Sequence, residues 1–266
     1  MGELAIYRRL VGARIRADLQ YRTSFFLFLA SQTLVAGLDL AVILVLFTQV
    51  SSIGGWSAPE VALLYGLAGT GFGLADLFAS EVELASRHIK AGTFDLFLLR
   101  PAGALLQLCA TEFAPRRIGR LVQPLIVIVV VLGRVDISWT PAKVVLIPVA
   151  ILSGAVIFSA IWVITSSVSF WTVETQEVSN SFTYGGLTLS QYPIDVFGTW
   201  LRRMVTFVLP LAFVSYFPAA YLLDKPVAFG LPSSVALLAP VVAIVLVFVA
   251  RAVWQLAVRH YRSTGS

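Results

Sequence analysis

Few side chains in this sequence could do chemistry, and the most unusual of them is an acid inside an apolar run. Asp39 interrupts the stretch LVAGLDLAVILVLF, which carries no other charge. An ionised acid at the centre of a membrane helix costs about 2.5–3.5 kcal/mol on insertion scales. Two interpretations stay open: a proton-relay or pathway residue, or a carboxyl that bonds to a neighbour such as Gln32 or lies near the outer interface.

No catalytic or metal-binding set accompanies this acid. His88 and His260 are far apart in the sequence, and Cys109 is the only cysteine, which excludes a disulfide or a thiolate cluster within these 266 residues. A phosphate-binding GxxxxGK[ST] loop needs a lysine after a glycine. None of the three lysines, at positions 90, 143 and 225, has that context. We therefore expect a chain that is not an enzyme and holds no metal or cofactor.

The composition places most of the chain in lipid. It is 58% hydrophobic and 12% charged, with a mean hydropathy of +0.88, whereas soluble domains carry about 25% charged residues. The net charge of +5 could suggest a protein that binds nucleic acid. The basic residues, however, lie at the ends of apolar runs instead of clustering on one polar face. We expect an all-α, multi-pass membrane protein that does not bind nucleic acid.

Five apolar runs are long enough, or nearly so, for the roughly 20 residues that a membrane helix needs. Ser57 and Glu60 form a capping box before the second run. Thr140 and Pro141 are typical of a helix start before the fourth. The predicted spans are 24–47, 60–80, 118–134, 141–170 and 234–257, and a further crossing lies between them in 171–233.

Two segments compete for that fifth crossing, and both give six spans. Hydropathy favours 200–223; the alternative is 175–192, which turns 195–223 into a helical hairpin in the outer leaflet. In the first topology every lysine and arginine lies on the side of the termini except Arg134, Lys143 and Lys225. In the second topology Arg202 and Arg203 also lie on the opposite side. Either obeys the positive-inside rule, so we expect both termini in the cytoplasm.

The first 22 residues differ from the remaining 23–266, which we expect to form one six-span domain. Apolar residues recur at helical spacing, and five arginines lie among them. The apolar residues are Leu4, Tyr7, Val11, Ile15 and Leu19. This pattern predicts an amphipathic helix over 1–22 in the headgroup plane of an anionic leaflet. A solvated basic leader is the alternative.

A short polar connection, RHIKAGTFDLFLLRP, separates the second and third runs. Gly92 is a natural helix terminator, Thr93 can cap a new helix, and Asp95 lies in its first turn. Pro101 stops that helix. Phe94, Phe97 and Leu98 then share one face, which could lie on the bilayer or dock in a groove of another protein.

Three glycines in the second run, Gly66, Gly69 and Gly73, lie at spacings that allow another helix to approach closely. The stretch GTGFGLA superficially matches a dinucleotide-binding loop, but it lies inside a span and follows no strand. We expect these glycines to pack helices, either within the subunit or at a dimer interface.

Two longer motifs carry a family resemblance. IKAGTFDLFLLRPAGALLQL resembles the segment after the second span in type-2 permeases of the ATP-binding-cassette (ABC) transporters, and is closest to the uncharacterised-exporter branch. YPIDVFGTWLRRMVTFVLPLAFVSYFPAAYLL resembles the stretch after the fifth span of the same superfamily. With six spans and an N-terminal amphipathic helix, the resemblance covers essentially the whole chain.

The resemblance implies roles that spacing alone does not. Residues 87–101 match the coupling helix, which is seated in a cleft of the ATPase subunit. This match implies that five residues contact the ATPase: Arg87, Lys90, Asp95, Phe97 and Arg100. The segment 195–223 matches a hairpin that sits in the outer leaflet and helps to close the exit, which favours 175–192 as the fifth crossing.

The implied function is the permease subunit of an ATP-driven exporter in a bacterial plasma membrane. It would pair with itself or with a related permease and with two cytoplasmic ATPase chains, which carry the ATP and Mg. The alternative is an ion-coupled secondary carrier that uses Asp39 and Asp76. An inverted internal repeat would support that alternative, and the sequence shows none.

Overall fold

Helices make up most of the part of the chain that the structure, a computed structural model, describes. The described residues are 11–12, 15–16, 20–79, 82–83, 85–99, 103–111, 117–172 and 176–261. Within them the only extended pairing is one isolated bridge between Ile53 and Trp56. Most of the amphipathic helix predicted over 1–22 lies outside the described residues.

Four described helices are long and apolar enough to cross a membrane. They match four of the predicted spans: α2 (Arg22–Gln49), α3 (Ala58–Ala79), α8 (Pro141–Ser167, continued by the 3-10 turn Val168–Phe170) and α12 (Ala239–His260, preceded by the 3-10 segment Ser233–Leu238). α7 (Ile118–Leu132) is apolar but has only 15 residues. The structure gives four candidate spans, or five with the bent pair described below, and the count of six stays a prediction.

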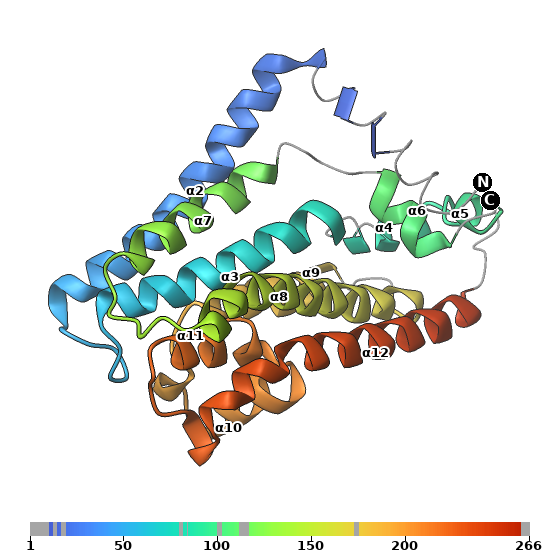
Figure 1. The fold of residues 1–266 in the computed structure, drawn as a ribbon. Helices are drawn as coiled ribbons and strands as arrows, with labels where there is room; N and C mark the ends of the chain where they lie inside the picture. Colours follow the sequence, from blue (N-terminus) through green and yellow to red (C-terminus); the bar gives the residue numbers. More distant parts are fainter. Residues whose placement is uncertain are drawn as a thin grey trace.

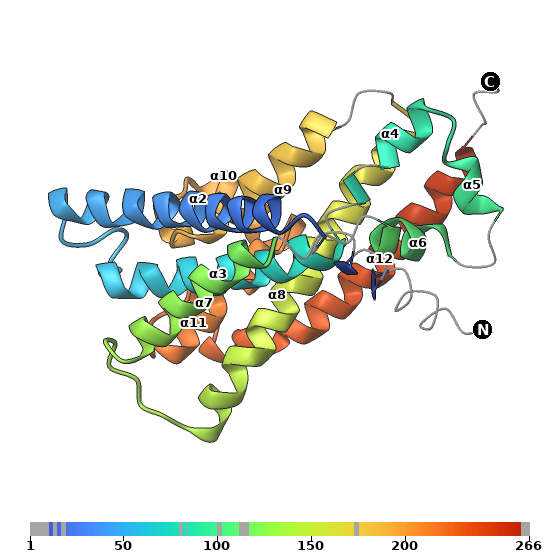
Figure 2. The same ribbon diagram turned by 90° about the horizontal axis from the view of Figure 1, so that it is seen from above.

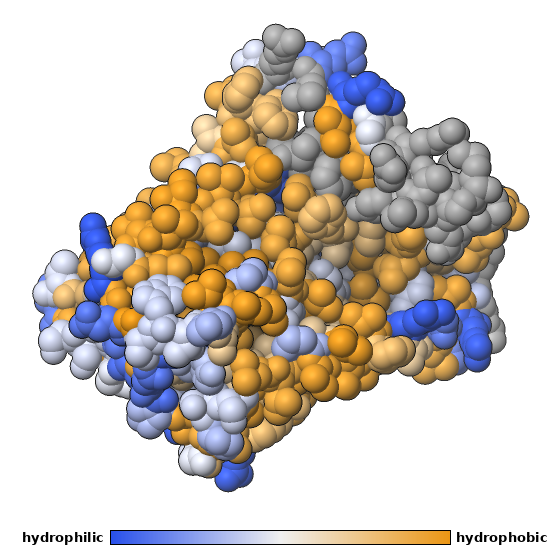
Figure 3. Space-filling view, in the orientation of Figure 1, coloured by the Kyte–Doolittle hydropathy of each residue, from blue (hydrophilic) through white to orange (hydrophobic). Residues whose placement is uncertain are grey.

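α3 forms the centre of the bundle. It packs between α7 and α8, while α2 lies along α7 and α12 along α8 (Figure 1). Of the α3 span, 83% is buried, against 11% of the α2 span. On the face drawn in Figure 3, apolar side chains cover the long sides of the bundle, and more polar side chains gather at the end where α10 (Thr199–Arg203) lies. A surface of this kind is stable only in lipid or against another protein.

Local capping follows the sequence at two helix starts. The backbone N–H of Ser57 donates to the Glu60 carboxylate at 2.7 Å. The Thr140 hydroxyl accepts from the backbone N–H of Lys143 at 3.3 Å, and Pro141 occupies the first turn of α8. These contacts satisfy N–H groups that a helix start otherwise leaves unpaired.

The segment 195–223 is broken, although its hydropathy suits one crossing. Its limbs, α10 with the π-helical segment η5 (Thr199–Arg203 and Met204–Val208) and the 3-10 turn Leu211–Phe213 with α11 (Tyr216–Leu222), meet at 72°. Both ends of the segment lie at the same end of the bundle. A Cβ on Gly54 would lie 2.9 Å from Val196, and Lys225 Nζ donates to the Gly55 carbonyl at 2.9 Å.

α9 (Gln176–Ser190) runs the length between the two ends of the bundle. Near its start the Ser179 hydroxyl contacts the Thr165 hydroxyl at 2.9 Å, close to the end of α8. Its last residue, Ser190, accepts a hydrogen bond from Ser215, in the bent segment. α9 therefore connects the end of α8 to the bent segment, while the placement of these elements in a membrane stays a prediction.

Gly66, Gly69 and Gly73 of α3 face α7 inside the subunit. A Cβ on Gly66 would lie 2.6 Å from the Ile128 side chain, and one on Gly69 would lie 2.8 Å from Pro124. At Gly73 it would lie 2.8 Å from the backbone Cα of Leu121. We expected these glycines to pack helices either within the subunit or at a dimer interface. In the structure they contact a helix of the same subunit.

We expect Gly73→Ala to destabilise the protein by about 1–3 kcal/mol, because the added methyl meets backbone that must move. The matched control is Gly37→Ala in α2, where a Cβ has nothing within 4 Å and alanine favours a helix. Thermal unfolding in detergent checks both variants. Equal unfolding temperatures for the two would contradict this packing.

Candidate functional site

The connection between the second and third runs forms two short helices at one end of the bundle (Figure 2). α4 (Ala85–Lys90) ends at Gly92, whose φ of +66° is the left-handed conformation of a helix terminator. The Phe94 N–H donates to the His88 carbonyl at 3.1 Å, which closes the turn. The prediction for Gly92 is confirmed, and the turn leads directly into α5 (Asp95–Leu98).

The predicted cap at Thr93 is wrong. Its hydroxyl lies 2.9 Å from His88 Nδ1 and donates to the His88 carbonyl at 3.4 Å. Phe94 occupies the position before α5, and no side chain caps that helix. The hydroxyl is engaged by the end of the preceding helix, so it stabilises the turn at Gly92 instead.

Phe94 anchors the turn to the ends of the long helices. It is fully buried, and its ring lies 5.2 Å from that of Phe170, 6.3 Å from Trp254 and 5.1 Å from Tyr261. Phe170 follows α8 and Trp254 lies on α12, so this aromatic cluster joins α5 to both helices.

Phe97 lies inside the subunit, and its role as an ATPase contact stays a prediction. Only 7% of it is exposed. Its ring packs on His88 at 4.9 Å, and Gln107 Nε2 donates to its carbonyl at 2.9 Å. Gln107 belongs to α6 (Ala104–Thr111). The shared apolar face predicted for Phe94, Phe97 and Leu98 is therefore only partly correct, because 45% of Leu98 is exposed.

The outward side of this region carries other residues. Leu96 is 56% exposed and Leu99 82%. Arg87 and Lys90 on α4 are exposed, and Asp95 is half-buried. The structure thus brings together three of the five predicted contacts beside exposed leucines, while Arg100, with Pro101, lies outside the described residues. We call residues 85–99 the coupling surface, after the role that the family resemblance predicts for them.

A second polar site lies deeper, at the end of α3. Asp76 is 2% exposed, although a position near the end of a span is typical of a solvated side chain. Its carboxylate pairs with Arg117 at 2.9 Å and Arg120 at 3.2 Å. Sequence reasoning missed this pairing. The signal was RRIGR, a dense arginine run at the start of α7, which brings two cations to an acid that would otherwise be unstable at this depth.

Arg120 also connects this ion pair to a recess of about 90 Å³. Its guanidinium lies 5.7 Å from the ring centroid of Tyr184 on α9, and Asp39 of α2 lines the same recess. Tyr65 borders it too, donating to the Gln123 side chain at 2.6 Å. Four helices, α2, α3, α7 and α9, therefore contribute polar groups to one place within the bundle.

Asp39 lies on the exposed side of α2. Among the residues that the structure describes, none donates a hydrogen bond to its carboxylate, and Gln32 Oε1 is itself buried without a partner. The expected bond to Gln32 is absent from this part of the chain. Asp39 thus remains a polar group on an apolar face, at the edge of the recess.

At the opposite end of the bundle, Lys143 holds the end of the bent segment. Its Nζ is buried and donates to Asp224 at 2.7 Å, to the Leu222 carbonyl at 3.0 Å and to Ser138 at 2.8 Å. The hydrogen bonds that Asp224 accepts from Lys143 and Ser138 hold the pKa of its carboxyl below the usual range.

This shift predicts a pH dependence of stability. The stabilisation by Asp224 is complete above the unfolded pKa of about 3.9 and is lost as the pH falls through the lower folded pKa. We expect Asp224→Asn to unfold at a lower temperature at pH 7 and to respond less to acid below about pH 4. Thermal unfolding from pH 7 to pH 3 checks this, with the exposed Asp136→Asn as control. Identical acid curves for wild type and Asp224→Asn would contradict it.

Comparison with known proteins decides the family. The model of the ABC-2 family transporter proteins matches residues 33–265. The chain belongs to the ABC-2 transporter family. The match runs from within α2 to the end of α12 and includes the coupling surface and the bent segment. The curated proteins and the solved structures give no match.

This membership confirms the resemblance to type-2 ABC permeases. Members of the family are multi-pass membrane components of ABC transporters that work with ABC ATPase subunits. The long apolar helices of this permease and the apolar surface along the bundle agree with that role.

Proposed function

We propose that this permease is the membrane subunit of an ATP-driven exporter and that the coupling surface is where a separate ABC ATPase binds. Exposed leucines beside Arg87 and Lys90 support this proposal, because an apolar patch with basic neighbours on a projecting turn suits a groove in a partner. ATP and Mg would be held by the ATPase. The family match is the observation that carries the proposal.

The aromatic cluster gives the coupling surface a mechanical role. Phe94 joins α5 to residues at the ends of α8 and α12, and the Gln107 bond ties α5 to α6. A movement of the ATPase that displaces α5 would therefore displace the ends of two long helices together. This rigid connection supports rocking of the bundle on ATP binding.

A second permease copy, or a related permease, would cover the α2 face. The α2 span is only 11% buried, and an exposed ionisable residue such as Asp39 is costly in lipid. Both observations favour a protein partner on this face over lipid. Substrate would then move along the interface, past the recess bordered by Asp39 and Arg120.

We further propose that α9 is the fifth crossing and that 195–223 is a helical hairpin in the outer leaflet. Both termini would be cytoplasmic, and the 1–22 helix would lie on the inner headgroups. The membrane would be a bacterial plasma membrane. The shared location of both ends of the hairpin supports this topology. The positive-inside distribution supports the orientation.

A cysteine at position 203, in a Cys109→Ser background, should react with a membrane-impermeant thiol reagent added outside the cell. Two cysteines are the matched controls. The one at position 136 should react from outside, and the one at position 90 should react only after permeabilisation. Reaction at position 203 only after permeabilisation would favour the straight 200–223 crossing instead.

The secondary-carrier alternative needs Asp39 and Asp76 to exchange ions. The two arginines on Asp76 disfavour it, because both oxygens of this carboxylate are already engaged in ion pairs. The test is purification from native membranes in mild detergent, where we expect an ABC ATPase and its ATP hydrolysis to co-purify. A chain that instead acidifies proteoliposomes on its own, and stops doing so as Asp39→Asn, would overturn the proposal in favour of a carrier.

A further inference from the structure

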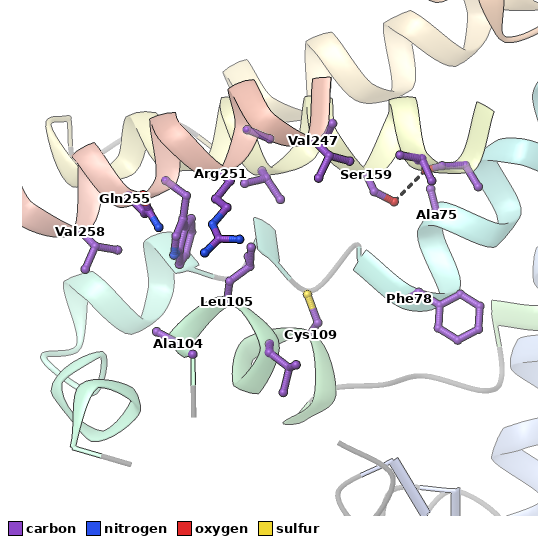
Figure 4. A pocket seen from close by; sticks show the side chains of 18 of the residues that line it. Ala75, Phe78, Ala104, Leu105, Cys109, Ser159, Val247, Arg251, Gln255 and Val258 are labelled. Carbon is purple, nitrogen blue, oxygen red and sulfur yellow. Dashed lines mark hydrogen bonds between the residues drawn. The ribbon is translucent and has the colours of Figure 1, made fainter. Parts of the chain in front are cut away.

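A large apolar groove adjoins the coupling surface at Leu98 and lies apart from the recess. It has a volume of about 1390 Å³ and lies between the last turns of α3, α6, and the facing sides of α8 and α12 (Figure 4). Phe78, Leu105 and Val247 are among the apolar residues that line it. We call it the α6 groove.

One polar stripe runs along this groove. Arg251, Gln255 and Arg259 follow each other at four-residue spacing on α12, and residues at that spacing share a helix face. The Arg251 side chain extends toward Leu105 on the opposite wall (Figure 4). Among the described residues that line the groove none is acidic, and neither arginine forms an ion pair with a described residue. Within that part of the chain, the groove has two positive charges beside an apolar wall and no acidic partner for them.

The groove has about the depth of one lipid leaflet. Val247 and Arg259 are twelve residues apart on α12, which corresponds to about 18 Å along a helix. Half of the hydrocarbon core of a bilayer is about 15 Å. An acyl chain could thus lie along the apolar wall while its headgroup reaches the level of Arg259, and a long arginine side chain at position 251 can extend toward the same level.

We propose that the α6 groove binds an anionic phospholipid, with one acyl chain between α8 and α12 and the phosphate at Arg251 and Arg259. Basic pockets between membrane helices recognise anionic headgroups by charge. The 1–22 segment is the poorer occupant, because its five arginines would face like charges. A zwitterionic lipid would fill the apolar wall equally well but would leave the two arginines without a net negative partner. This inference does not depend on export or on the ATPase.

Native mass spectrometry of the full chain tests it. The probe is a mixed micelle with equal amounts of phosphatidylglycerol and phosphatidylcholine of the same acyl chains. We expect preferential retention of phosphatidylglycerol, with about a fivefold loss of that preference for each of Arg251→Gln and Arg259→Gln. The matched control is Arg134→Gln with Arg203→Gln, two exposed arginines toward the other end of the bundle, which should leave the preference unchanged.

A second measurement locates the lipid in the groove. Cys109 lines it and is the only cysteine of the chain, so phosphatidylglycerol should slow its reaction with a small thiol reagent more than phosphatidylcholine does. Equal retention of the two lipids, an equal loss of preference in the control pair, or a Cys109 rate indifferent to phosphatidylglycerol would each overturn the proposal.

Discussion

Replacing Asp76 with asparagine should lower the free energy of unfolding of this permease by about 3–5 kcal/mol, the largest stability effect that we expect from a single substitution. The side chain of Asp76 is 1% exposed and pairs with two guanidinium groups that are themselves 25% and 22% exposed. Without the carboxylate, two cations remain close together in a medium of low dielectric constant. Equilibrium unfolding in mixed micelles measures the change.

Two comparisons identify the cause of this loss. Asp136→Asn removes an exposed carboxyl and should change stability by no more than about 0.5 kcal/mol. Adding Arg120→Gln to Asp76→Asn should restore part of the loss, because one uncompensated charge is then gone. An Asp76→Asn variant as stable as Asp136→Asn would show that the ion pair does not hold α3 and α7 together.

Changing Leu96 and Leu99 together to aspartate should weaken ATPase binding by about 100-fold or more without unfolding the permease. Burial of two leucines contributes about 3–6 kcal/mol to an interface, and a buried carboxylate adds a further penalty. Both side chains are more than half exposed in the subunit, at 56% and 82%, so the fold should tolerate the change. Co-purified ATPase and the unfolding temperature are the two readouts.

Two further variants separate binding from folding. Phe97→Ala should lower the unfolding temperature, because it empties a buried position, and its effect on coupling is then indirect. Val50→Asp places the same charge on an exposed apolar residue near the opposite end of the bundle and should leave ATPase binding intact. If the double aspartate variant still bound the ATPase as wild type, the leucines would face lipid.

The long helices were predictable because their signal is local. Apolar runs of span length, with caps at Ser57 and Thr140, placed α2, α3, α8 and α12 to within a few residues. The terminator at Gly92 was predictable for the same reason, since only backbone conformation at one residue decides it. Such features need no knowledge of what packs against them.

Features that depend on distant partners were not predictable. Asp76 has the sequence context of a solvated acid, and its burial depends on arginines 41 and 44 positions away. Hydropathy cannot distinguish a straight 200–223 helix from one broken at Leu209 and Pro210, because the composition is the same. Spacing groups Phe97 with Leu98 on one face and the resemblance makes it an ATPase contact, but neither tells which side of the short helix faces the bundle.

The central claim is that the coupling surface binds a separate ABC ATPase subunit. The most direct measurement places a photo-reactive amino acid at position 99 or, as control, at position 50, and irradiates native membranes. We expect position 99 to cross-link to a polypeptide with an ABC nucleotide-binding domain, more efficiently than position 50 does. Cross-links from position 99 to lipid alone, with no nucleotide-binding protein attached, would contradict the account.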